Sequence, residues 1–205
     1  MKDGHIIYNR IERRDAAENR QRILDTASGL FEQFGVEQVS MNQIASEAQI
    51  GPGTLYRRYR NKGEICLDLI KDNVVLCFED MEGYLKENQK EPPSKRLRGI
   101  LSIFIRFRES KAQLLKGVEV FESAKQSKSG TPGPLYHELH QYFVGLFDEM
   151  APTSEGKPNN VFRADMLLAA IKSDSYLFQR EVRGYSPEEI LELLWDTFLG
   201  IKWIN

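Results

Sequence analysis

The sequence predicts an all-α protein of about nine helices. Apolar residues recur at helical spacing along nearly the whole chain, and no stretch alternates apolar and polar residues as a half-buried strand does. Breaks rich in Gly, Pro, Ser and Asn separate helical stretches, most clearly at residues 125–134 and 151–160. The hydrophobic content of 41% and the charged content of 28% are ordinary for a soluble globular protein.

The N-terminal part is expected to form three helices. The first is amphipathic and ends near Gly35, a residue type that favours the C-cap. A capping box from Ser40 to Gln43 opens a short second helix. The break "QIGPG" separates this helix from a third that runs from Pro52 to about Tyr59. Two short helices joined by a tight turn and preceded by a longer helix are typical of a helix-turn-helix unit.

The remaining helices are predicted from breakers and caps. A long helix runs from Lys62 to about Asn88, and the two prolines of "EPPSK" prevent its continuation. Ser94 is expected to cap the next helix. The last helix begins at "SPEE", where Ser186 and Glu189 make a capping box.

Composition and charge narrow the cellular setting. The 205 residues carry a net charge of −2 and no apolar stretch long enough to span a bilayer. The N-terminus lacks an apolar segment followed by a small-residue cleavage site, so we expect no secretory signal. Cys66 and Cys77 would lie on one helix roughly 16 Å apart, too far for a disulfide. These features predict a cytoplasmic protein with no membrane partner.

Basic residues cluster at one point of this slightly acidic chain. Four cations and no acidic residue fall within the ten residues 53–62. Such a charge run often only keeps a surface soluble. Here it coincides with the outward side of the third helix, because Leu55 and Tyr59, four residues apart, would face the core. The cluster therefore predicts a DNA-binding surface.

The residue types on this surface suit DNA. Arg57 and Arg58 can grip guanine O6 and N7 bidentately in the major groove. The hydroxyl of Tyr56 can reach a phosphate, and Gly53, which lacks a Cβ, lets the backbone come close to one. Lys62 begins the next helix and is well placed for a flanking phosphate. The predicted DNA-binding residues are Gln43, Gly53, Thr54, Tyr56, Arg57, Arg58 and Lys62.

The segment "SMNQIASEAQIGPGTLYRRYRNK" resembles the DNA-binding motif of TetR-family transcriptional regulators. The family pattern runs roughly T-x-x-x-I-A-x-x-A-G-V-S-x-G-T-L-Y-x-H/Y-F-x-x-K, and the resemblance covers about residues 16–69. The chain departs from the pattern at Gln49 in place of the turn Gly, at Gly51 in place of a Ser or Thr cap, and at Arg58 in place of a common His or Tyr. The matching residues are Ile44, Ala45, Ala48, Gly53, Thr54, Leu55, Tyr56 and Lys62.

The resemblance implies an N-terminal arm and helix-turn-helix domain over residues 1–62, and an effector-binding and dimerisation domain over 63–205. It implies a homodimer that binds a palindromic operator in double-stranded DNA, most often as a repressor released by a small molecule. Aromatic residues in the middle helices predict a largely apolar or aromatic effector, and no cofactor is predicted. The predicted effector-binding residues are Phe104, Phe107, Phe121, His137, Tyr142 and Phe178, with Glu119, Glu122, His140 and Arg106 as further polar candidates.

The last predicted helix is apolar over much of its circumference and therefore needs cover on two sides. Its own domain covers one side. A second subunit is expected to cover the other, together with the helix around Met166, Leu167 and Ala170. Full burial inside a monomer is the alternative. The apolar residues of this helix are Ile190, Leu191, Leu193, Leu194, Trp195, Phe198, Leu199, Ile201 and Trp203.

Other readings have less support. His137 and His140 have a spacing that can share a metal ion, but no Cys or third His lies nearby in sequence, so no metal site is predicted. The chain carries no G-x-S-x-G, H-E-x-x-H, Walker or dinucleotide-binding motif, and nothing else in it supports an enzyme. The alternatives are a helical enzyme or carrier that retains the DNA-binding segment unused, and a regulator controlled by a protein partner with no small-molecule ligand.

Overall fold

The computed structural model describes residues 3–129, 134–151 and 159–199, with side chains over 16–121, 135–151 and 159–199. The regular structure in these ranges is entirely helical, which confirms the predicted class, and comprises ten α-helices and one π-helical turn. No helix in them is both long and apolar enough to cross a membrane. The elements are α1 (Asp3–Phe34), α2 (Met41–Glu47), α3 (Pro52–Arg58), α4 (Lys62–Glu87), α5 (Pro93–Ser110), α6 (Ala112–Ser129), α7 (Pro134–Met150), α8 (Asn160–Ala170), α9 (Ser173–Leu177), η1 (Phe178–Val182) and α10 (Pro187–Phe198).

The chain divides into two compact units, Met1–Ile70 and Lys71–Asn205, and the division falls within α4. The first turns of α4 therefore belong to the N-terminal unit and the rest of this helix to the C-terminal unit. The predicted domains divide between residues 62 and 63, at the start of α4. The two compact units divide eight residues later, inside this helix.

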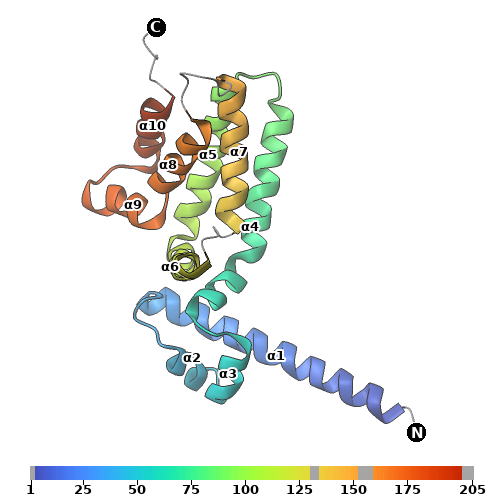
Figure 1. Cartoon of the computed structure of the whole chain (residues 1–205). Helices are drawn as coiled ribbons and strands as arrows, with labels where there is room; N and C mark the ends of the chain where they lie inside the picture. The colour runs from blue at the N-terminus through green and yellow to red at the C-terminus, as the bar shows by residue number, and fades with distance from the viewer. Residues whose placement is uncertain (1–2, 130–133, 152–158, 200–205) are drawn as a thin grey trace. The chain divides into compact units, whose positions relative to one another are not determined.

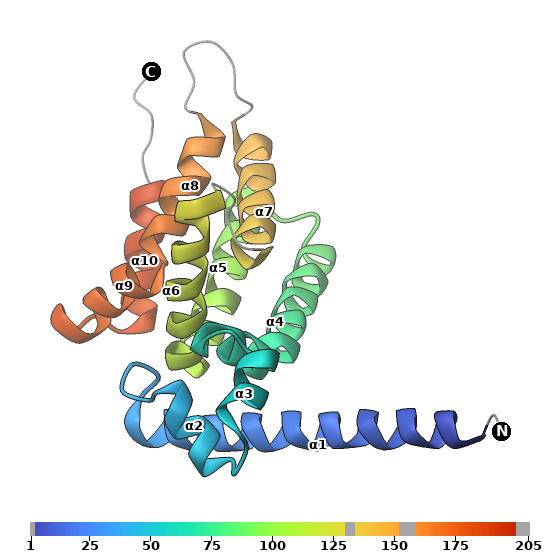
Figure 2. The ribbon, with the colours of Figure 1, turned by 60° about the horizontal axis from the view of Figure 1, so that its bottom comes forward.

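In the N-terminal unit, α2 packs against α1 and α3 packs against α2 (Figure 1). The first part of α1 extends beyond both short helices (Figure 2). Gly35 ends α1 in the left-handed conformation, with φ of 78°, as its predicted C-cap role requires. The buried side chains beneath the short helices are Ile23, Ala27, Phe31, Val39, Ile44, Ala45 and Leu55.

The caps of the two short helices agree with the sequence in part. The Ser40 hydroxyl accepts a hydrogen bond from the Gln43 amide at 3.1 Å, which is the first half of the predicted capping box. The return bond from the Gln43 side chain is not formed in this described segment. At α3, Gly51 is the N-cap and Pro52 the first helical residue, as predicted.

In the C-terminal unit, α7 packs on α5 and α8, and α10 packs against α5 and α8. In addition, α6 contacts α5 and α9, and α9 runs directly into η1 (Figure 1). Phe and Leu side chains fill the space between the central helices. Buried members of this core include Leu97, Leu101, Phe104, Leu139, Phe143, Phe147 and Leu167.

Two predicted boundaries in this unit are wrong. α5 begins at Pro93 with Pro92 as its N-cap, so Ser94 lies inside the first turn and does not cap the helix. Proline suits this position because its fixed φ is helical and its missing N–H needs no partner. α6 continues to Ser129, into the loop predicted over 125–134, because residues 125–129 contain neither Gly nor Pro. The capping box at the start of α10 is confirmed.

Candidate nucleic-acid interface

The inner side of α3 is held firmly within the N-terminal unit. Leu55 and Tyr59 are buried, as predicted. The Tyr59 hydroxyl donates to the Asp68 carboxylate at 2.5 Å, and Arg20 donates two further bonds to the same carboxylate at 2.8 and 2.6 Å. Burial, followed by this bond to Asp68, raises the pKa of Tyr59, so its hydroxyl stays a donor. One carboxylate of α4 thus fixes both α1 and the end of α3.

The outer side of α3 carries side chains that the fold does not use. Tyr56 and Arg57 are exposed, and neither makes a side-chain hydrogen bond or ion pair with a described residue; the same holds for Arg60 just beyond the helix. A Cβ added to Gly53 would meet no atom within 4 Å. Intramolecular packing therefore gives no reason for Gly at this position, whereas the close approach of a partner would.

Three predicted DNA-binding residues are less open to a partner than Arg57. The exposed Arg58 turns back toward α1, where its guanidinium donates to the Ala16 carbonyl at 3.4 Å and lies 5.9 Å from the centroid of the Tyr59 ring. Thr54 and Gln43 are half-buried on α3 and α2. Arg57, Tyr56 and Gly53 therefore form the open part of the predicted surface, and Arg58 flanks it.

Lys62 has a structural role that the sequence did not reveal. Its ammonium donates to the carbonyls of Val36 and Glu37, at 2.5 and 3.0 Å, just beyond the end of α1. An ammonium has three N–H donors, so one remains for the phosphate contact predicted from the motif. No local signal predicts this tie, because the partners are 26 and 25 residues away.

In the turn between α2 and α3, Gln49 adopts the left-handed backbone conformation although it is not a glycine. Gln49 has a φ of 53°, a conformation that glycine adopts without cost and other residues adopt at about 1–2 kcal/mol. The amide of Gln49 donates to the Ser46 carbonyl and that of Ile50 to the Ala45 carbonyl, both at 3.0 Å, so both of these turn amides are satisfied. The departure from the family pattern at Gln49 thus leaves the turn geometry intact.

The predicted effector-binding residues do not surround one cavity in the described structure. Phe107 lines a groove of about 250 Å³ between α4 and α5, and Phe104 is buried behind it with ring centroids 6.1 Å apart. Tyr142 stacks on Phe78 and donates to Glu82 at 3.2 Å. The others, Phe121, His137 and Phe178, are half-buried or exposed on α6, α7 and η1, and the side chain of Glu122 lies outside the described residues.

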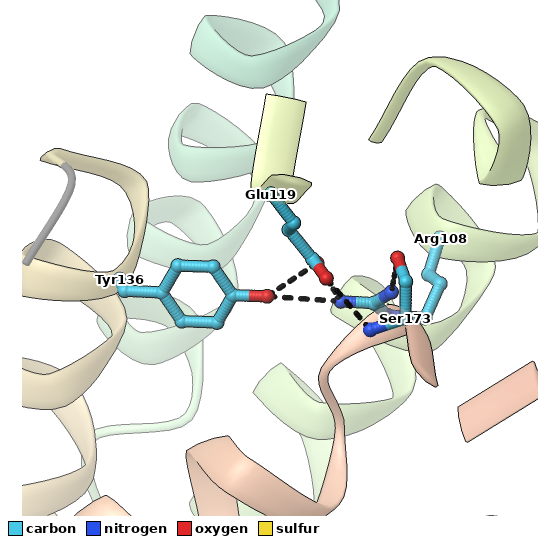
Figure 3. A network of polar contacts seen from close by, with 4 residues as sticks. All are labelled: Arg108, Glu119, Tyr136 and Ser173. Carbon is cyan, nitrogen blue, oxygen red and sulfur yellow. Dashed lines mark hydrogen bonds and ion pairs between the residues drawn. The ribbon is translucent and has the colours of Figure 1, made fainter. Parts of the chain in front are cut away.

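A buried polar network joins four elements of the C-terminal unit (Figure 3). Arg108 of α5 donates to the Ser173 hydroxyl at 2.8 Å, to Glu119 at 2.7 Å and to the Tyr136 hydroxyl at 3.3 Å. Glu119 also accepts from the Tyr136 hydroxyl and, at 2.7 Å, from the Ser173 amide. Sequence reasoning named Glu119 as a ligand candidate and did not predict this network.

The environment of this network is apolar. Arg108 is 1% exposed, and its guanidinium lies 5.2 Å from the Phe104 ring centroid and 5.6 Å from that of Tyr176. Burial, together with the adjacent Glu119 carboxylate, raises the pKa of Tyr136 above its ordinary value. Its hydroxyl therefore stays protonated and donates to Glu119. A buried pair of this kind is costly to break, because the remaining charge has no solvent.

His137 and His140 contact different partners. His140 faces the Asp165 carboxylate of α8 at 3.2 Å, whereas His137 shares a hydrogen bond of 3.0 Å with Gln141. Within the ranges that the structure describes, no group of three or more His, Cys, Asp or Glu residues could hold a metal ion.

Comparison with known proteins agrees with this geometry. The sequence model of "Bacterial regulatory proteins, tetR family" matches residues 23–69, which span the end of α1 through the start of α4. An HTH-type transcriptional regulator of Staphylococcus aureus (strain USA300) is 30% identical over 190 residues, which cover 91% of this chain and 96% of the relative. A second, from strain MRSA252, is 31% identical over the same shares.

Solved structures share the fold. Thermus thermophilus FadR, a TetR-family transcriptional repressor solved in complex with lauroyl-CoA, has a TM-score of 0.64 at 18% identity, covering 91% of this chain and 96% of its own. NalD of Pseudomonas aeruginosa, the secondary repressor of the MexAB-OprM multidrug efflux pump, has a TM-score of 0.59 at 20% identity, covering 93% and 100%. With a firmly held α3, a basic outer face and relatives matched over nearly their whole length, this chain belongs to the tetR family of bacterial regulatory proteins and is a helix-turn-helix transcriptional regulator.

Proposed function

We propose that this regulator inserts α3 into the major groove of a palindromic operator, with Arg57 reading a guanine and Tyr56 bonding a phosphate. The observation that carries the proposal is the contrast between the two sides of α3. Its inner side is tied to α1 and α4 through Leu55 and Tyr59, whereas Arg57 is exposed and has no partner among the described residues. Gly53, which no neighbour requires to be small, is open to the phosphate backbone.

A homodimer is the second part of the proposal. Apolar side chains stay exposed on two adjacent helices, where Phe162 of α8 is 59% exposed and Leu193 of α10 is 46% exposed. Val161 and Met166 of α8 widen this surface. A symmetric contact between α8 and α10 of two subunits would bury them in a four-helix interface. Two copies of α3 would then read half-sites about one helical turn, ~34 Å, apart.

Control by a small molecule is the third part. The protein acts as a repressor, and an effector that favours a wider separation of the two DNA-binding units lowers its operator affinity. The groove between α4 and α5 supports a small-molecule effector over the alternative of a protein partner, because it is a concave site of limited size that has both apolar and polar lining residues. The other predicted effector-binding residues remain candidates for contacts made after the effector binds.

Selection of randomised duplex DNA by the purified protein, at about 150 mM salt, tests the central claim. Enrichment of a palindrome supports dimeric, sequence-specific binding and yields the operator. A folded dimer that enriches nothing, alone or with added cell extract as a source of effector, contradicts it. The enriched duplex then provides the probe for measuring the effect of candidate effectors on affinity.

A further inference from the structure

We propose that the groove between α4 and α5 binds a small amphipathic molecule with one negative charge, held by Arg106 and Lys111. This inference rests on the proposed control by an effector and gives that effector a chemical class. The groove lies within the C-terminal unit and has a volume of about 250 Å³. Its lining residues are Asn73, Leu76, Cys77, Asp80, Ile103, Arg106, Phe107, Ser110 and Lys111.

The arginines of α5 are the first observation. Four lie on this helix, and three have carboxylate partners: Arg96 pairs with Glu149, Arg98 with Glu192 and Arg108 with Glu119. The fourth, Arg106, lines the groove and makes no ion pair or side-chain hydrogen bond with any residue that the structure describes. An unpaired guanidinium at a concave surface is suited to bind a carboxylate, sulfonate or phosphate in a bidentate manner.

The charge balance of the groove points to a single negative charge. Arg106 and Lys111 face one carboxylate, that of Asp80, and the Lys111 ammonium also lacks a partner among the described residues. Cys77 adds no charge, because burial, reinforced by Asp80 and opposed by Arg106, raises the pKa of its thiol to about 12. A monoanion therefore neutralises the groove, whereas a cation would meet two like charges.

Apolar side chains from both helices lie beside the polar Asn73 and Ser110 and fit a small ring system. Leu76 and Cys77 contribute from α4, and Ile103 and Phe107 from α5. The Ser110 hydroxyl donates to the Phe107 carbonyl at 2.8 Å, so its proton is not available to a ligand. The volume lies just below the usual range for ligand pockets, which favours a compact body of at most about three rings or a short chain.

A matched pair of fluorescent probes tests the charge preference directly. 8-Anilinonaphthalene-1-sulfonate carries one sulfonate, and N-phenyl-1-naphthylamine has the same aromatic frame without it. We expect the sulfonate to bind the wild-type dimer at least about tenfold more tightly, since a hydrogen-bonded ion pair is worth that much or more. Arg106→Gln should remove this preference and leave the affinity for the neutral amine unchanged. Equal affinities in the wild type, or an unchanged preference in Arg106→Gln, would overturn the proposal.

Further variants locate the binding site. Arg98→Gln removes a cation from the same helix outside the groove and should leave the sulfonate affinity unchanged. Leu76→Glu adds a carboxylate within the groove and should weaken sulfonate binding, whereas Val182→Gln, which removes an exposed apolar side chain of η1, should not. Loss of binding in Val182→Gln alone would assign the probe to another surface and contradict the proposal.

This experiment needs no DNA, so its outcome is independent of operator selection. Operator enrichment without a charge preference would remove the groove proposal and leave the DNA-binding function standing. A charge preference without operator enrichment would support the groove proposal and contradict the DNA-binding function.

Discussion

Arg108 of α5 and Arg57 of α3 occupy opposite extremes of environment. The guanidinium of Arg108 is buried and bonded to Ser173, Glu119 and Tyr136. That of Arg57 is exposed and bonded to no described residue. The comparison separates cations that the fold needs from cations that are available to a partner. The charge of Arg108 joins four elements of the C-terminal unit, whereas that of Arg57 makes no bond that supports the fold.

The largest expected effect comes from breaking the buried pair. Arg108→Ala should lower the free energy of unfolding by about 3–5 kcal/mol, because it leaves the Glu119 carboxylate buried without its cation. Urea denaturation of the protein at pH 7 measures the change. A loss below 1 kcal/mol would mean that water reaches Glu119 and that the network is not as closed as its burial indicates.

A double variant is the matched control. Arg108→Met combined with Glu119→Leu removes both charges and fills much of the same volume, so it should recover at least half of the lost stability. The recovery should be incomplete, since the Tyr136 hydroxyl and the Ser173 amide lose their acceptor.

The opposite behaviour is expected on α3. Arg57→Ala should change the free energy of unfolding by no more than about 0.5 kcal/mol, and should weaken binding to the selected operator by about 1–3 kcal/mol. Fluorescence anisotropy with the operator and with substituted duplexes measures the affinities. Equal loss of affinity for every sequence would show that Arg57 contacts phosphate and does not read a base.

Lys62 sharpens the comparison because it belongs to the DNA-binding motif and also to the fold. Lys62→Met should lower the free energy of unfolding by about 1–2 kcal/mol, since two backbone carbonyls lose a charged donor. It should also flatten the dependence of DNA affinity on salt if the third N–H reaches a phosphate. Loss of stability with an unchanged salt slope would leave Lys62 as a structural residue only.

The sequence predicts α3 well because all the necessary signals are local. Gly51, Pro52 and the spacing of Leu55 and Tyr59 define where the helix begins and which side is buried, and the structure agrees at each point. The hydrogen bonds of Lys62 and Asp68 could not be predicted in this way, because the bonded residues are up to 48 positions apart in the sequence.

The C-terminal unit was predicted less well for the same reason. Arg106 and Arg108 are two residues apart, so they point to nearly opposite sides of α5, one into the groove and one into the core. Arg106 was predicted as a polar ligand candidate, but no prediction identified Arg108 of "FIRFRES" as a buried residue. That choice depends on Glu119, Tyr136 and Ser173, which come from three later helices.

A smaller effect is expected at the turn between α2 and α3. Gln49→Gly should raise the free energy of unfolding by about 1 kcal/mol, because glycine adopts the observed φ of 53° without steric cost. Gln49→Ala is the control and should give no such gain. Thermal unfolding of the three proteins measures this. An equal gain in both variants would mean that the Gln49 side chain, and not the backbone, limits stability.

The smallest effect is expected at Glu109 and Arg180, a half-exposed pair that lies between the two extremes. Partial burial, the largest single influence, would raise the pKa of Glu109. The hydrogen bonds from Arg180 at 3.0 and 3.1 Å, the Tyr176 hydroxyl and the charges of Arg180 and Arg108 together outweigh it and lower this pKa. A lowered pKa stabilises the fold above the ordinary carboxyl value of 4.5, and this contribution is lost as the pH falls through the lower folded value. Glu109→Gln should therefore be less stable than the wild type at pH 7, by at most about 1 kcal/mol, and the difference should shrink as the pH falls below 4.5. Urea denaturation at pH 7 and at several lower pH values measures it. A difference that does not shrink would assign the role of Glu109 to packing instead of charge.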